Sequence, residues 1–257
     1  YACKLKDKYS NIKVVYGCEF YEAFDVNVRD KNNKYFHLII LAKNERGRVA
    51  INNLITKSEF KGKYNKPRID LKALAPYGND LIVSSACLAS KIAREPNYDK
   101  CISYIKEYKK VFPHFYLEMQ SHKHLDQELY NKKILKLSID TNTPYIITCD
   151  SHAATEEDLK YQAKHVQIAH DDETASEVYE GCYIQSDEEI HEIMDPQIGS
   201  EAVSIGLLRT DEVADLIDEV KMPFQSPQLP TFPLPDGFED NYTYLKFLVD
   251  KGWIERG

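Results

Sequence analysis

Apolar runs of strand length alternate with helical segments along most of this chain. The runs predicted to be strands are residues 13–20, 35–42, 80–84, 115–120 and 144–148. Helical patterns follow the later strands, at roughly 88–111 and 125–140. Strands that alternate with helices favour a parallel sheet covered by helices, an α/β fold. The alternation leaves open whether that sheet closes into a barrel.

The composition is that of a globular protein with a core of its own. The chain has 257 residues, of which 43% are hydrophobic, enough for one large domain or two small ones. No apolar run approaches the roughly 20 residues that cross a bilayer, and the start at Tyr1 has no signal-peptide pattern. We therefore expect a cytoplasmic protein with no membrane partner.

Charge and cysteine content exclude two further classes. The formal net charge of -8 argues against a chain that grips DNA phosphates by itself, because non-specific binding needs clustered Lys and Arg. The 6 cysteines have no CxxC spacing, so a disulfide framework is not expected. Free or metal-bound thiols are the better prediction.

The C-terminal part of the sequence predicts a domain boundary. The helical pattern of residues 200–220 is followed by prolines that interrupt the chain repeatedly, and helical periodicity returns at 241–253. We predict one domain at 1–220, an extended linker at 221–237, and the opening helix of a further region at 238–257.

Side chains that can bind metal gather at the predicted strands. Glu19 ends the first strand, and four others follow later strands, namely Cys87, His122, Asp150 and His152. The carboxyl ends of strands are where α/β folds build active sites, because the loops there converge on one mouth. His37 lies near the beginning of its strand. Convergence from several strands is what indicates a site.

Each of these residues also has a structural interpretation. Asp150 and His152 would face the same side of an extended segment and reach one ion or two adjacent ions, or they are a turn Asp and a surface His. Cys87 is a ligand or a small buried hydrophobe. A buried Glu19 would need a cation or a hydrogen-bond partner, whereas His37 is a ligand or a packed core histidine.

The remaining histidines are weaker candidates for metal ligands. His124 could take the place of His122, because both lie in the loop before a predicted helix. The others are expected to be solvated or structural, and they are His114, His165, His170 and His191.

Seven ordered sequence blocks resemble one family. The blocks are 17–21 (GCEFY), 36–38 with 41–44, 66–70 (KPRID), 85–89 (SACLA), 118–122 (EMQSH), 150–152 with 157–158, and 229–235 (LPTFPLP). They resemble the PHP (polymerase and histidinol phosphatase) domain of bacterial DNA polymerase III alpha subunits, and they run in family order over nearly the whole chain.

The resemblance implies a distorted seven-stranded (β/α) barrel with up to three metal ions at its mouth. Six of nine family ligand positions are present, at Glu19, His37, Cys87, His122, Asp150 and His152. The others would belong to His-x-His and Asp-His-Gly motifs in a segment before Tyr1. We therefore expect a fragment that lacks the first strand-helix segment and the polymerase core.

The chain departs from the family pattern near the expected ligands. Ala86 and Lys123 stand where glycine is usual, which could crowd loops that glycine allows to turn, and Cys149 replaces a common Asn. The region 171–181 is shorter than the family pattern.

The resemblance implies metal-dependent phosphodiester hydrolysis that removes 3′-terminal nucleotides, with Asp150 and His152 as the catalytic residues. Mixed N, O and S donors suit Zn²⁺ or Mn²⁺ better than Mg²⁺. Nucleotide polymerisation, with its own Mg²⁺, would lie in an absent part of the parent protein. DNA, a proofreading exonuclease subunit and the sliding clamp are the partners expected through that parent.

Two other functions remain open. The domain could be a non-catalytic module that docks a proofreading exonuclease, as in relatives that have lost ligands. It could also be a free-standing PHP phosphatase that acts on a small phosphate ester, although the proline-rich exit argues against this alternative.

Overall fold

The computed structural model describes residues 8–9, 12–30, 35–171, 179–220 and 231–256. The chain divides into two compact units, Tyr1–Lys221 and Met222–Gly257. Residues 221–230 of the predicted linker and 172–178 of the shortened region lie outside the described residues. The assignment of roles to the domains stays a prediction.

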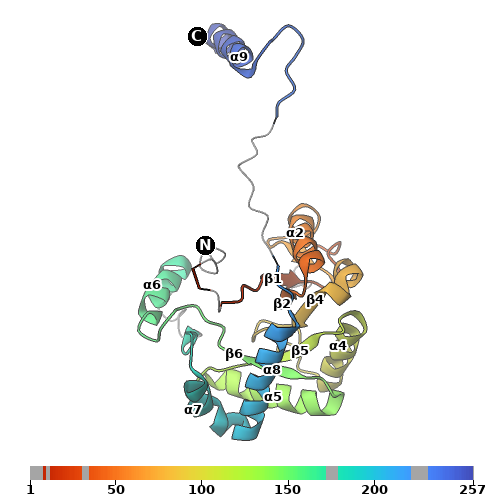
Figure 1. The fold of residues 1–257 in the computed structure, drawn as a ribbon, viewed down its shortest axis with the longest axis vertical. Helices are drawn as coiled ribbons and strands as arrows, with labels where there is room; N and C mark the ends of the chain where they lie inside the picture. Colours follow the sequence, from red (N-terminus) through yellow and green to blue (C-terminus); the bar gives the residue numbers. More distant parts are fainter. Residues whose placement is uncertain (1–7, 10–11, 31–34, 172–178, 221–230, 257) are drawn as a thin grey trace. The chain divides into compact units, whose positions relative to one another are not determined.

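The first unit is built on a mixed sheet (Figure 1). Its described strands are β1 (Gly17–Glu22), β2 (Phe36–Ala42), β3 (Arg68–Ile69), β4 (Leu81–Ser84), β5 (Phe115–Gln120) and β6 (Tyr145–Thr148). The strand order is β3-β1-β2-β4-β5-β6. The runs 35–42, 80–84, 115–120 and 144–148 each contain a strand, whereas the run 13–20 overlaps β1 only at residues 17–20.

The expectation of a parallel sheet is wrong for β2. This strand is antiparallel to both of its neighbours, β1 and β4, whereas the pairs β1–β3, β4–β5 and β5–β6 are parallel. A parallel pair needs a crossover connection, usually a helix. The described residues between β1 and β2 contain no helix, and the chain returns beside β1 in the opposite direction.

The described sheet is open in its pairing order. Within the described residues, no pairing joins β3 to β6. The α/β class is thus confirmed, whereas a closed seven-stranded barrel goes beyond the described strands.

Helices accompany the strands. They are α2 (Glu45–Phe60), α3 (Leu71–Leu74), the 3-10 helix η1 (Ala75–Asp80), α4 (Tyr98–Val111), α5 (Leu125–Thr141), α6 (Leu159–His170), α7 (Asp187–Ile198) and α8 (Ser200–Leu216). Helices α2, α5 and α8 contact β2, β5 and β6 respectively (Figure 1). The second unit contains α9 (Asn241–Arg256), at the position where helical periodicity resumes in the sequence.

Helix α4 begins later than the sequence pattern indicated. Helical residues were expected from about 88, but residues 85–97 form a loop after β4. Pro96 is unfavourable inside a helix, and the side chain of Asn97 caps α4 by accepting a hydrogen bond from the Lys100 amide at 3.0 Å. This loop carries Cys87.

The core lies between the sheet and its helices. Buried side chains from the strands include Leu38, Val83, Leu117 and Ile147, each no more than 2% exposed. In the part of the chain described here, no helix is both long and apolar enough to span a membrane.

Candidate metal centre

His37 contacts both Glu19 and Cys87. In the antiparallel pair β1–β2, Tyr21 is opposite His37 and Glu19 is opposite Ile39. Residues two apart on a strand share a face, so the Glu19 carboxylate reaches across to His37. The distance from His37 Nδ1 to Glu19 Oε1 is 3.2 Å, and that to Cys87 Sγ is 3.6 Å.

Two expectations about Glu19 are wrong. Glu19 lies within β1 rather than at its end, and its side chain is 40% exposed rather than buried. Alternation along the strand explains the exposure, because Phe20 and Glu22 point into the protein, whereas Glu19 and Tyr21 lie on the face that carries the cavity.

The contacts of His37 favour its cationic form. Hydrogen bonding to Cys87, and then to Glu19, raises the pKa of His37 to about 9, against the opposing effect of burial. A histidine binds metal through a neutral ring nitrogen, so His37 would have to release a proton on binding.

Cys87 is positioned by a strained turn. Ala86 has a φ of 57° and is buried, and the left-handed region is unfavourable for residues with a Cβ atom. The glycine that is usual here in the family would adopt this conformation freely.

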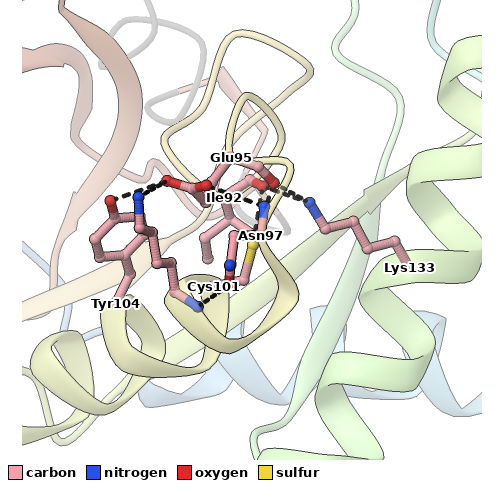
Figure 2. A network of polar contacts seen from close by, with 7 residues as sticks. Ile92, Glu95, Asn97, Cys101, Tyr104 and Lys133 are labelled. Carbon is pink, nitrogen blue, oxygen red and sulfur yellow. Dashed lines mark hydrogen bonds and ion pairs between the residues drawn. The ribbon is translucent and has the colours of Figure 1, made fainter.

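The far end of the same loop is held by a polar network (Figure 2). Lys133 of α5 donates hydrogen bonds from Nζ to the carbonyl oxygens of Ile92 and Glu95, at 2.9 and 2.8 Å. The Cys101 thiol lies 3.6 and 3.5 Å from the same two oxygens. The Glu95 carboxylate accepts from the Asn97 amide and the Tyr104 hydroxyl. The backbone around Arg94 is thereby fixed.

His122 follows β5 and is buried, and this burial lowers its pKa. Its Nε2 atom lies 3.1 Å from the carbonyl oxygen of Cys149 and 3.4 Å from Cys182 Sγ. A contact with a carbonyl oxygen places the proton on Nε2, which leaves Nδ1 as the nitrogen with a free lone pair.

Asp150 and His152 follow β6 in a turn, not in the extended segment that was expected. Asp150 has a φ of 46°, a left-handed conformation that Asp tolerates better than most residues. His152 Nδ1 lies 2.6 Å from the Asp150 carbonyl oxygen, so the lone pair is on Nε2. The His152 ring packs edge-on against Tyr179, with centroids 4.6 Å apart.

All six predicted ligands line one cavity of about 560 Å³. They come from β1, β2 and the segments after β4, β5 and β6. His37 joins them because the antiparallel β2 places its beginning beside the end of β1. Their role as ligands stays a prediction.

The chemical types of these donors suit a metal ion, but their positions among the described residues do not form a site for one. Imidazole, carboxylate and thiolate together suit Zn²⁺ or Mn²⁺. Within the described residues, however, no three His, Cys, Asp or Glu side chains are placed so that they could hold one ion. Two of the imidazoles, those of His122 and His152, also hydrogen bond to backbone carbonyls.

The alternative ligand His124 does not line the cavity. Its side chain caps α5 by accepting a hydrogen bond from the Asp126 amide at 3.3 Å. Of the other histidines, His114 contacts Lys43 at 2.9 Å and His191 contacts Asp195 at 2.8 Å, away from the cavity. Both therefore have the structural role that was expected.

Residues 1–122 match the family model of the PHP domain. The chain is 32% identical to the DNA polymerase III subunit alpha of Borreliella burgdorferi, over 95% of this chain and 22% of that protein. This chain carries a PHP domain related to those of DNA polymerase III alpha subunits. The corresponding subunits of Treponema pallidum and Helicobacter pylori are 27% and 28% identical, over 95% and 97% of this chain. The chain spans only 22% and 23% of their lengths.

The cavity of this PHP domain contains residues that sequence reasoning missed. Arg94, Gln120, Gln127 and Tyr179 also line it, and Cys182 is buried beside His122. Gln120 belongs to a family block, but an amide carries no distinctive metal signal. Arg94 lies in a segment where the sequence pattern indicated a helix and the structure has a loop, so nothing local in the sequence marked it as a cavity residue.

Proposed function

We propose that this chain is the PHP domain of a DNA polymerase III alpha subunit and that its cavity is a metal-dependent phosphodiesterase site acting on DNA 3′ ends. The observation that carries the proposal is the convergence of six donor side chains from five segments of the sheet on one cavity. Chemistry built at strand ends is typical of α/β enzymes.

The proposed ligands of Zn²⁺ or Mn²⁺ are Glu19, His37, Cys87, His122, Asp150 and His152. A bound ion would lower the pKa of a water molecule and neutralise charge on the phosphate. The chain's own residues orient these donors: the Asp150 carbonyl oxygen holds the His152 ring, and the Cys149 carbonyl oxygen holds His122. Asp150 and His152 are proposed to be catalytic, with the Asp150 carboxylate as proton acceptor.

The proposal also covers the activity of the longer protein to which this domain would belong. DNA-directed nucleotide addition, with Mg²⁺, would belong to a polymerase core outside this chain, and replication in the cytoplasm would be its setting. The net charge of -8 implies that other parts of the parent hold the DNA. A proofreading exonuclease subunit and the sliding clamp are proposed partners, and a seventh strand would complete a barrel.

Elemental analysis combined with a 3′-exonuclease assay tests this site. The given chain and a chain extended at its N-terminus by the His-x-His and Asp-His-Gly motifs are compared with Zn²⁺ and with Mn²⁺. We expect bound metal and hydrolysis in the extended chain, both lost in Asp150→Ala and both retained in Asp211→Ala, which removes an exposed carboxylate from α8.

A docking module is the second candidate. It is favoured by the observation that no three donors within the described residues are in place for an ion. An extended chain without metal or activity would support this candidate and contradict the nuclease. The free-standing phosphatase gains no support from the three relatives above, which are all polymerase subunits.

A further inference from the structure

The buried carboxyl group of Glu118 connects the ends of three neighbouring strands. Glu118 lies in β5 and is 4% exposed. Its oxygens accept hydrogen bonds from the Ser84 hydroxyl of β4 and, at 2.7 Å, from the Thr148 hydroxyl of β6. The side-chain amide of Gln120 in β5 donates a third hydrogen bond at 3.1 Å. These three partners are the last residues of β4, β6 and β5.

The segments that carry most of the proposed ligands begin at these strand ends. The pairs β4–β5 and β5–β6 are parallel, so the three carboxyl ends lie at one edge of the sheet. Four of the six proposed ligands follow there, namely Cys87, His122, Asp150 and His152. Glu118 therefore connects three ligand-bearing segments that are far apart in the sequence.

Side chains continue the contact of β4 with β5 where the strand pairing stops. The paired residues end with Ser84 and Tyr116. Beyond them, the Ser85 amide donates to the Tyr116 carbonyl oxygen at 3.0 Å, and the Glu118 amide donates to the Ser85 hydroxyl at 2.9 Å. The hydrogen bond from Ser84 to the Glu118 carboxyl group belongs to the same contact. The start of the loop that carries Cys87 is thus attached to β5 through Glu118.

Glu118 lies beneath the cavity and is not among the described residues that line it. It can act on a bound ion only through the segments that it connects. A buried carboxyl group is unfavourable unless hydrogen bonds replace its contacts with water, and the three donors supply such bonds. Fully bonded polar networks of this kind make a buried region more rigid.

We propose that Glu118 is a positioning residue of the metal centre, which sets the spacing of the segments after β4, β5 and β6. The inference rests on the proposed function, because the side chains that it positions are the proposed ligands. Groups that orient metal ligands without touching the ion typically contribute about 10- to 100-fold to metal affinity.

Two substitutions of Glu118 separate its hydrogen bonds from its charge. Glu118→Met removes every acceptor. Glu118→Gln keeps Oε1 for Thr148 and Gln120 and turns Nε2 to Ser84, whose hydroxyl group can accept a hydrogen bond. The matched control is Asp80→Asn, because Asp80 is 8% exposed, lies before β4 and accepts from Asn44 at 3.0 Å.

Amide hydrogen exchange of the full chain in a chelating buffer tests the connection without metal. We expect Glu118→Met to speed exchange about tenfold in 85–90 and 149–153. Glu118→Gln and Asp80→Asn should leave both segments as in the parent. Equal exchange in all four chains would overturn the positioning role.

Substitutions of single donors keep the test decisive if Glu118→Met does not fold. Ser84→Ala should speed exchange in 85–90 alone, and Thr148→Val in 149–153 alone, because each substitution releases one strand end. A melting temperature near that of the parent shows that these variants are folded. Faster exchange spread evenly over the chain would mean that Glu118 has only a general effect on stability.

Zn²⁺ binding to the chain extended at its N-terminus gives the second readout, measured by competition with a chromophoric chelator. We expect the dissociation constant to rise about 10- to 100-fold in Glu118→Met and to stay unchanged in Glu118→Gln and Asp80→Asn. Equal binding by the parent and Glu118→Met would overturn the positioning role and keep the proposed function. An extended parent that binds no metal would overturn the proposed function, and the exchange pattern would then decide by itself whether Glu118 sets the spacing.

Discussion

At the scale of single residues, Ala86 is held in a conformation that suits glycine. Its φ is 57°, and it is 1% exposed. The left-handed region costs a residue with a Cβ atom about 1–2 kcal/mol, and glycine loses about 0.4–1 kcal/mol through its freer unfolded chain. We expect Ala86→Gly to raise the free energy of unfolding by about 0.5–1 kcal/mol, measured by urea denaturation.

A substitution by glycine inside a regular helix is the control. It should change the free energy of unfolding in the opposite direction. Ala163→Gly in α6 should lower the free energy of unfolding by about 1 kcal/mol, because glycine is unfavourable inside a helix. Equal effects of the two substitutions would contradict strain at Ala86.

The buried carboxyl of Glu118 predicts a dependence of stability on pH. Burial raises the pKa of Glu118 above its ordinary value of 4.5, although Ser84, Thr148 and Gln120 donate hydrogen bonds to it. The folded state then binds more protons than the unfolded state, so stability is fully present below about pH 4.5 and falls as pH rises through the folded pKa.

The variant Glu118→Gln removes this titration. We expect the free energy of unfolding of the parent, relative to the variant, to fall as pH rises from about 4.5 to 8. Urea denaturation across this pH range measures the difference. A parent that gained stability relative to the variant over the same range would mean that the three donors outweigh burial.

At the scale of elements, α8 protects the edge of the described sheet at β6. Thr210 Oγ1 accepts from the Ile147 amide at 3.2 Å and lies 2.9 Å from the Ile147 carbonyl oxygen. Gly206 allows the close approach, because a Cβ atom there would lie 2.6 Å from Ile147 Cδ1. Thr210 thus serves backbone groups that an edge strand leaves unpaired.

Thr210→Val should lower the free energy of unfolding by about 1–3 kcal/mol, because it leaves the Ile147 amide without its partner. Chemical denaturation measures this loss. Thr56→Val on α2 is the matched control, since Thr56 is exposed and bonds only to its own helix, at Asn52. A loss no greater than that of the control would show that α8 is not needed at this edge.

At the scale of the whole molecule, the division into two units predicts that the first unit is stable without the second. Helix α9 has no buried residue, whereas Ile217 and Val220, at the end of the first unit, are 4% and 8% exposed. We expect a chain shortened to residues 1–221 to keep the unfolding transition of the full chain. Thermal unfolding followed by circular dichroism provides the measurement.

A chain that is shortened further, into the first unit, provides the comparison with the chain 1–221. A chain ending at residue 199 loses α8 and uncovers β6, so it should melt at a lower temperature or not fold. A large loss of stability on removing only 222–257 would show that the first unit depends on the second.

The sequence by itself determined where most of the strands lie and which side chains are the candidate ligands. Periodicity depends on neighbours along the chain, so local pattern alone locates the runs that contain β2, β4, β5 and β6 and that overlap the first part of β1. The family blocks likewise identified six side chains that all line one cavity.

Only the tertiary structure decided how these parts meet. The antiparallel direction of β2, which brings His37 to Glu19, is set by hydrogen bonds between strands rather than by residues within one strand. The left-handed turn at Ala86, the burial of the Gln120 and Gln127 amide oxygens, and the position of Arg94 likewise depend on distant groups. The physical reason is that local pattern limits each element, whereas pairing direction and cavity lining arise from contacts between residues far apart in the chain.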